Sequence, residues 1–160
     1  MMLRPSWLGD VRAMISVRQS ALCSIGMYSP AQMKCWRQAV DETELRTFID
    51  QEDGTSICAV EEGQSIVGYA CLRFGTSAHL LGLYAAAAWQ RRGVGTALLL
   101  AAHAICADRN VSRVHVAASM NAAPFYAGHG YVEGNLIQWR PQGTEEGPEI
   151  PTLRMTYSFR

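Results

Sequence analysis

The sequence of 160 residues has no net charge and no long apolar run, and each absence excludes a class of protein. Its 14 basic residues balance 14 acidic ones, which gives no support for nucleic acid as the main partner. No apolar run reaches about 18 residues, so no membrane span is expected. Asp10 and Arg12 interrupt the N-terminus before an apolar core could form, so no signal peptide is expected and the predicted compartment is the cytoplasm.

The five cysteines are odd in number and lack the C-x-x-C spacing that is typical of metal sites. Because their surroundings are mostly apolar, we expect them to be reduced and largely buried, with no metal and no catalytic thiol. The sequence also has no repeats and no linker that would divide it. Residues 1–160 are therefore predicted to form a single domain, which can bury roughly 70% of its unfolded surface.

Residues 89–99, with the sequence WQRRGVGTALL, join an apolar strand-like run to an alanine- and leucine-rich helical pattern. Glycines at such a junction allow a tight turn and a close approach of the backbone to a ligand. The unpaired N–H groups of the first helical turn, at the positive end of the helix dipole, form an anion site suited to a pyrophosphate. The sequence thus predicts an enzyme that binds a phosphorylated cofactor, with an ordinary solvated turn as the alternative.

This glycine motif differs from the two common nucleotide-binding motifs. It has no Gly-Lys-Ser or Gly-Lys-Thr, which a P-loop requires, and it lacks the three glycines and distant acidic residue of the dinucleotide fingerprint. The pattern Gln-x-x-Gly-x-Gly resembles the acetyl-CoA signature of the GNAT N-acetyltransferases. Residues 80–85 (LLGLYA) resemble the family's fourth strand, and residues 121–131 (NAAPFYAGHGY) resemble its later Asn, Tyr and Gly-Tyr motif.

Hydrophobic periodicity and turn residues predict an α+β fold. Strands are expected at residues 2–5, 55–61, 65–74, 78–86, 113–118, 131–139 and 152–159, with a loop at 141–151. Helices are expected at residues 11–23, 30–37, 42–51, 94 to about 108, and 121–128, with N-caps at Asp10, Ser29, Asp41 and Asn121. The resemblance implies a central mixed, mostly antiparallel sheet of about seven strands with helices on both faces.

The resemblance implies that acetyl-CoA is the co-substrate and that no metal takes part. Its phosphates would be bound chiefly by the backbone N–H groups of the glycine loop, and its pantetheine arm by the preceding strand. A backbone N–H near Leu83 would polarise the thioester carbonyl. The residues implied for this site are Leu83, Tyr84, Ala85, Gln90, Arg91, Arg92, Gly93, Val94, Gly95, Thr96 and Asn121.

Tyr126 and His79 are the candidate catalytic residues. Tyr126 matches the family's tyrosine near the CoA sulfur, where a protonated phenol could hydrogen-bond a developing thiolate, although it could also simply pack on the last helix. His79 stands where many family members have a Glu on the fourth strand, and an imidazole is a credible base near neutral pH. The alternative is an exposed histidine with a water chain as the base. Asn121 resembles an Asn that touches the pantetheine arm, but a helix N-cap accounts for it equally well.

The family's acceptor region implies Tyr28 and Trp36 as substrate-binding residues, unless they merely pack the helix pair. The acidic loop 142–149 either attracts a cationic amine or is simply solvated; its carboxylates are Glu145, Glu146 and Glu149. The resemblance implies direct attack by a primary amine, of a small molecule or a peptide, in a ternary complex. A catalytically idle acyl-CoA-binding or regulatory domain on the same fold is the alternative. A homodimer through sheet edges is compatible with the pattern.

Overall fold

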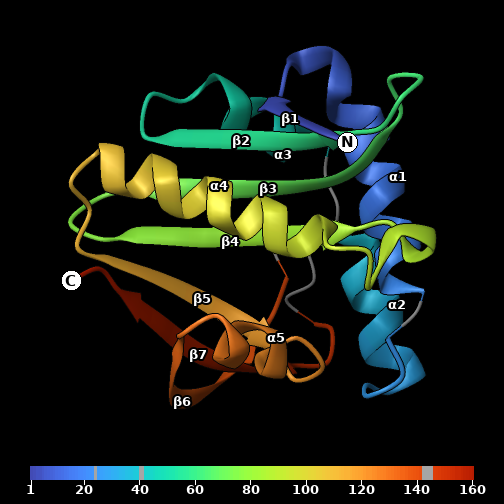
Figure 1. The fold of residues 1–160 in the computed structure, drawn as a ribbon. Coiled ribbons are helices and arrows are strands. Elements are labelled where there is room, and N and C mark those ends of the chain that lie inside the picture. Colours follow the sequence, from blue (N-terminus) through green and yellow to red (C-terminus); the bar gives the residue numbers. More distant parts are fainter. Residues whose placement is uncertain (24, 40–41, 142–145) are drawn as a thin grey trace.

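A computed structural model describes residues 1–23, 25–39, 42–141 and 146–160. Its centre is one seven-stranded sheet in the order β1-β2-β3-β4-β5-β7-β6 (Figure 1). The strands are β1 (Met2–Pro5), β2 (Gly54–Val60), β3 (Ile66–Phe74), β4 (Ala78–Ala85), β5 (Arg113–Ser119), β6 (Val132–Trp139) and β7 (Ile150–Ser158). All neighbouring strands are antiparallel except β4 and β5. The α+β fold class is confirmed.

Helices cover both faces of the sheet (Figure 1). The helical elements are η1 (Leu8–Asp10), α1 (Val11–Leu22), α2 (Pro30–Gln38), α3 (Glu42–Asp50), η2 (Ala87–Trp89), α4 (Val94–Asp108) and α5 (Ala123–Gly128). On one face, α4 and α5 bury side chains such as Leu98 and Tyr126 against the sheet. On the opposite face, α1 and α3 bury Met14 and Phe48.

The sheet opens between its two parallel strands. Pairing of β4 with β5 extends only from Ala78 and Val114 to Leu80 and Val116. In β4, Leu80 pairs with Leu72 of β3 while Gly82 pairs with Cys71, which leaves Leu81 as the extra residue of a β-bulge. A bulge bends its strand and increases the local twist. Beyond Leu81 the two strands diverge, and within the described residues no strand pairs with the backbone groups of β4 that face β5.

The predicted helix starts are confirmed in part. Ser29 caps α2, because its hydroxyl accepts from the backbone N–H of Gln32 at 3.1 Å and the Gln32 side chain accepts in return from Ser29. Asp10 stands at the N-cap of α1, but its carboxylate turns back to accept from the Trp7 N–H and to pair with Arg4 at 2.7 Å. The predicted cap at Asp41 lies outside the described residues.

Two other expectations need correction, whereas the expectation of reduced, largely buried cysteines is confirmed. Asn121 is not a helix cap, because α5 begins at Ala123 with Ala122 at its N-cap position. The predicted loop 141–151 is too long, since β7 begins at Ile150. Cys23 is exposed, whereas the other four cysteines are buried and all five are thiols. Across the described part of the chain, no helix combines the length and apolar character that crossing a membrane requires.

Candidate functional site

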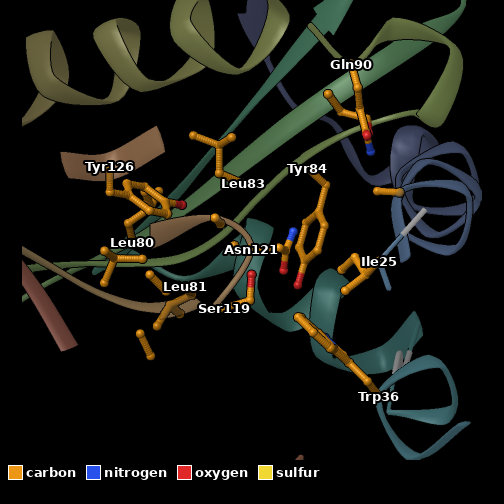
Figure 2. Close-up of a pocket in the computed structure, with 17 residues that line it drawn as sticks. Ile25, Trp36, Leu80, Leu81, Leu83, Tyr84, Gln90, Ser119, Asn121 and Tyr126 are labelled. Atoms are coloured by element: carbon orange, nitrogen blue, oxygen red, sulfur yellow. The ribbon is translucent and has the colours of Figure 1, made fainter. Parts of the chain in front are cut away.

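A cavity of about 230 Å³ lies where β4 and β5 diverge (Figure 2). It is lined by residues 80–85 of β4 and by residues 116–119 of β5, so it lies in the gap between the two strands. Ala21, Ile25 and Trp36 contribute from the side of α1 and α2, and Tyr126 contributes from α5. The lining residues therefore come from elements on both faces of the sheet.

The glycine loop lies next to this cavity and has the backbone geometry of an anion site. Arg91 and Gly93 both adopt positive φ angles, 61° and 84°. The first hydrogen bond of α4 runs from the Ala97 N–H to the Gly93 carbonyl at 2.9 Å, so the N–H groups of residues 94–96 have no partner within the helix. Gly93, the N-cap, has no side chain to occupy them. Successive unpaired N–H groups in such a turn form a concave nest for phosphate oxygens.

Side chains hold this loop against the sheet. The Gln90 amide donates to the Ala85 carbonyl at 3.3 Å, which ties the loop to the end of β4. The guanidinium of Arg92 lies 5.5 Å from the centre of the Trp89 ring. Both Arg91 and Arg92 are exposed, and they immediately precede Gly93, the N-cap of α4.

Thr96 of α4 is connected to α5 through a hydrogen bond with His129. The Nδ1 atom of His129 lies 2.8 Å from the Phe125 carbonyl, which can only accept, so Nδ1 carries the proton. In the neutral ring Nε2 then accepts from the Thr96 hydroxyl at 3.3 Å. The Thr96 side chain is therefore committed to positioning α5, and only its backbone N–H faces the predicted phosphate site.

Tyr126 is 5% exposed and lines the cavity. Its ring packs edge-to-face on Phe125 and Tyr131, with centroids 5.2 Å apart in each pair. Figure 2 shows its hydroxyl pointing into the cavity, and within the described residues that hydroxyl makes no hydrogen bond. Burial, with a smaller contribution from Tyr84, raises the pKa of Tyr126 well above its usual value. The phenol thus keeps its proton at any ordinary pH.

The cavity also brings together Leu83, Tyr84, Ala85, Gln90 and Asn121, five of the residues predicted to bind the cofactor. Tyr84 stands across the cavity from Tyr126, with its hydroxyl directed toward Trp36 (Figure 2). Asn121 is exposed and points its amide between Tyr84 and Ser119 (Figure 2).

His79 is not among the described residues that line the cavity. It lies exposed near the start of β4, opposite Arg73 and His115, with its ring 5.3 Å from that of His115. The structure therefore separates His79 from Tyr126, with which the sequence grouped it.

The two predicted acceptor residues differ in their contacts. Trp36 lines the cavity, whereas Tyr28 is not among its described lining residues. The Tyr28 hydroxyl donates to the Pro151 carbonyl at 2.7 Å and accepts from the Met120 N–H at 2.9 Å. Its ring packs edge-on against Trp36 at 5.7 Å. Tyr28 thus helps to hold the Trp36 side chain in its position at the cavity.

The acidic loop is only partly described. Glu145 lies outside the described residues, and Glu146 is exposed. Glu149 is also exposed and pairs with Arg140 at 3.4 Å. Where the chain is described, no group of three His, Cys, Asp or Glu side chains is arranged to hold a metal ion.

Sequence reasoning missed the contribution of β5. Val116, Ala117 and Ser119 line the cavity only because β5 pairs with β4 in parallel and then diverges from it. Alternation along β5 predicts which residues are buried, but it carries no information about which strand lies beside it. No local pattern could have identified these residues.

A family model described as acetyltransferase (GNAT) domain matches residues 25–140. Solved structures similar to this chain include a GCN5-related N-acetyltransferase from Rhodopseudomonas palustris, with 27% identity and a TM-score of 0.85 over 99% of this chain and 95% of that one. No curated protein matches this chain significantly.

Two further solved structures are similar in fold. The PaiA N-acetyltransferase from Thermoplasma acidophilum, solved in complex with coenzyme A, has 18% identity and a TM-score of 0.78, covering 99% of this chain and 98% of that one. A ribosomal-protein-alanine N-acetyltransferase from Brucella melitensis has 19% identity and a TM-score of 0.75, covering 99% and 100%. At these identities the likeness concerns the fold.

Proposed function

The chain belongs to the GNAT acetyltransferase family, and from this premise we propose that it transfers an acetyl group from acetyl-CoA to a primary amine. The observation that supports the proposal is a helix start with unpaired backbone N–H groups beside a cavity lined by Tyr126, whose protonated hydroxyl makes no hydrogen bond within the described residues. We further propose direct transfer in a ternary complex, in which both substrates meet at a cavity whose lining residues come from both faces of the sheet.

We propose that acetyl-CoA binds along β4 and the start of α4. Its pyrophosphate would accept hydrogen bonds from the N–H groups of residues 93–96, with Arg91 and Arg92 adding charge. Its pantetheine arm would follow residues 83–85, whose β5-facing backbone groups lack a strand partner, and would touch Asn121. The residues fit this ligand, because Gly93 places no side chain in the anion site and a Cβ there would meet no neighbour.

In the proposed reaction the amine nitrogen forms a bond to the acetyl carbon and the carbon–sulfur bond breaks. A backbone N–H near Leu83 stabilises the oxyanion, and Tyr126 supplies the proton that the leaving thiolate takes up. The amine loses its own proton to solvent. Tyr126 then recovers a proton from water, which restores the resting state.

For the base we propose a water chain that reaches the cavity from the α1 and α2 face, because His79 does not line the cavity. Under this proposal His79→Ala retains kcat/KM within about twofold from pH 6.5 to 9, since a well-positioned catalytic base typically contributes at least about 100-fold. Rates of CoA release across that range provide the measurement, and His115→Ala serves as the matched control. A loss confined to pH values below 8, recovered when the amine deprotonates unaided, would instead assign the base to His79.

Calorimetric titration with acetyl-CoA and then with free CoA tests the cofactor site directly. Both ligands are expected to bind with micromolar affinity, because the phosphates that contact the loop are common to them. CoA binding without CoA release in the presence of any primary amine would favour the idle acyl-CoA-binding domain. If neither ligand binds, the loop at residues 90–96 is an ordinary turn and the proposed activity is wrong.

A further inference from the structure

Arg18 is a half-buried cation beside the proposed acceptor side of the cavity. Its guanidinium carbon lies 5.5 Å from the centre of the Tyr84 ring, and Tyr84 lines the cavity. Ala21, one turn further along α1, also lines it. Arg18 is not itself among the described residues that line the cavity, but it lies beside Tyr84, which does line it.

This guanidinium has no anionic partner in the described residues. Its Nε atom is buried and makes no hydrogen bond there. The ion pairs found in the described chain, Arg4–Asp10, Arg46–Glu42 and Arg140–Glu149, do not include it. On the sheet side its guanidinium lies over the Tyr84 ring, and its charge lowers the pKa values of Tyr69 and Cys71, which burial raises by more, so neither supplies an anion at neutral pH.

An unpaired buried cationic donor is costly, because burial removes water without supplying a hydrogen-bond acceptor. A guanidinium is also the side chain best shaped to bind a carboxylate, through two parallel N–H donors. The position of Arg18 beside Tyr84 and the absence of an acceptor for its Nε–H within the described residues together indicate a ligand with an acidic group.

A second cation lies on the same face of the sheet, next to the part of β5 that lines the cavity. Val114, Val116 and Ala118 of β5 face α4, so Ala117 faces the side that α1 covers. Arg154 of β7 pairs directly opposite the cavity-lining Ala117, which places both side chains on that face. Arg154 is exposed and forms no ion pair within the part of the chain that the structure describes.

We propose that the acceptor carries a carboxylate, which Arg18 binds, while Arg154 adds to the positive electrostatic field beside the cavity. The inference rests on the proposed function, because it identifies the chemical class of the acetyl acceptor. It favours amino acids and acidic amines over polyamines and lysine-rich peptides.

Benzoate and benzamide are a matched pair of probes, since they have similar shapes but only benzoate is charged. Neither has an amine to acetylate, so the test depends on binding alone and needs no turnover. Titrated calorimetrically into the CoA-saturated protein, benzoate is expected to bind at least tenfold more tightly than benzamide. Arg18→Gln should abolish this difference. Arg18→Lys should retain part of it, because lysine keeps the positive charge but lacks the two parallel N–H donors of a guanidinium. Arg12→Gln is the matched control, because Arg12 is exposed on the same helix and should leave the preference intact.

Equal binding of the two probes to the unmodified protein overturns the proposal without reference to any variant. A tenfold preference that survives in Arg18→Gln also overturns its assignment to Arg18. CoA affinity, measured in the same titrations, separates these results from failure of the cofactor site. If the protein binds no CoA, the benzoate preference of the ligand-free protein still reports on Arg18 alone.

Discussion

Replacing Tyr126 with Phe is expected to lower kcat by roughly 100-fold or more, the usual contribution of a positioned acid. The thiolate would then leave without a proton donor in a buried cavity, where an unpaired charge is poorly stabilised. Affinity for CoA should change little, because the hydroxyl acts on the sulfur only as the carbon–sulfur bond breaks. Steady-state CoA release gives kcat, and calorimetry gives the affinity.

Tyr126→Phe tests the hydroxyl alone, because the ring and the hydroxyl of Tyr126 have separate roles. The ring packs on Phe125 and Tyr131, and those contacts remain in phenylalanine. Tyr131→Phe is the matched control: it removes a hydroxyl that lies 2.9 Å from Nε2 of His103, in the core between α4 and β7. That variant should lose about 0.5–1.5 kcal/mol of stability and keep its kcat.

The pH profile offers a second test of Tyr126. An ordinary phenol has a pKa of about 10, so about half of it is ionised at pH 10, and the ionised form no longer protonates the thiolate. Burial raises the pKa of Tyr126, so the protonated form persists above that value. The kcat of the unmodified protein should therefore show no alkaline fall up to about pH 10. A kcat within twofold of normal in Tyr126→Phe would remove the acid role from this residue.

Features encoded in short stretches of sequence were predictable. The Ser29 and Gln32 side chains satisfy each other's backbone N–H groups, so the start of α2 depends on residues three apart. The helix start at Val94 is likewise fixed by Gly93, since a positive φ there is easily reached without a side chain. The glycine turn at the start of α4 could accordingly be located from the sequence, and its binding of CoA stays a prediction.

Features that depend on strand pairing were not predictable. The bulge at Leu81 exists only in relation to the register of β3, and it is this bulge that turns β4 away from β5. Arg18 reads as one polar position on an amphipathic helix, and only the packing of α1 on β4 places it beside Tyr84. Asn121 followed the usual residue preference for a helix cap, but α5 starts two residues later and leaves Asn121 at the cavity.

Gly68→Ala is expected to destabilise the fold by about 1–3 kcal/mol, because β3 passes directly under the start of α4. An added Cβ would lie 2.7 Å from a Val94 methyl carbon, 2.9 Å from the Tyr84 carbonyl oxygen and 3.0 Å from a Leu98 methyl carbon. The carbonyl belongs to the sheet backbone and cannot move away cheaply, so α4 must shift. For a chain of this length the melting temperature should fall by roughly 2–4 °C per kcal/mol.

The same substitution should weaken CoA binding, which a purely structural defect elsewhere would not do. Val94 is both the residue that the new methyl group meets and the first residue of α4, so the displaced helix carries the predicted phosphate site with it. Gly128→Ala is the matched control, because a Cβ there meets nothing within 4 Å. It should leave CoA affinity unchanged and stability unchanged or slightly raised. Suppose that Gly68→Ala lowers the melting temperature but leaves CoA affinity intact. CoA binding would then not depend on the position of α4, and the N–H groups of residues 94–96 would not be the main phosphate ligands.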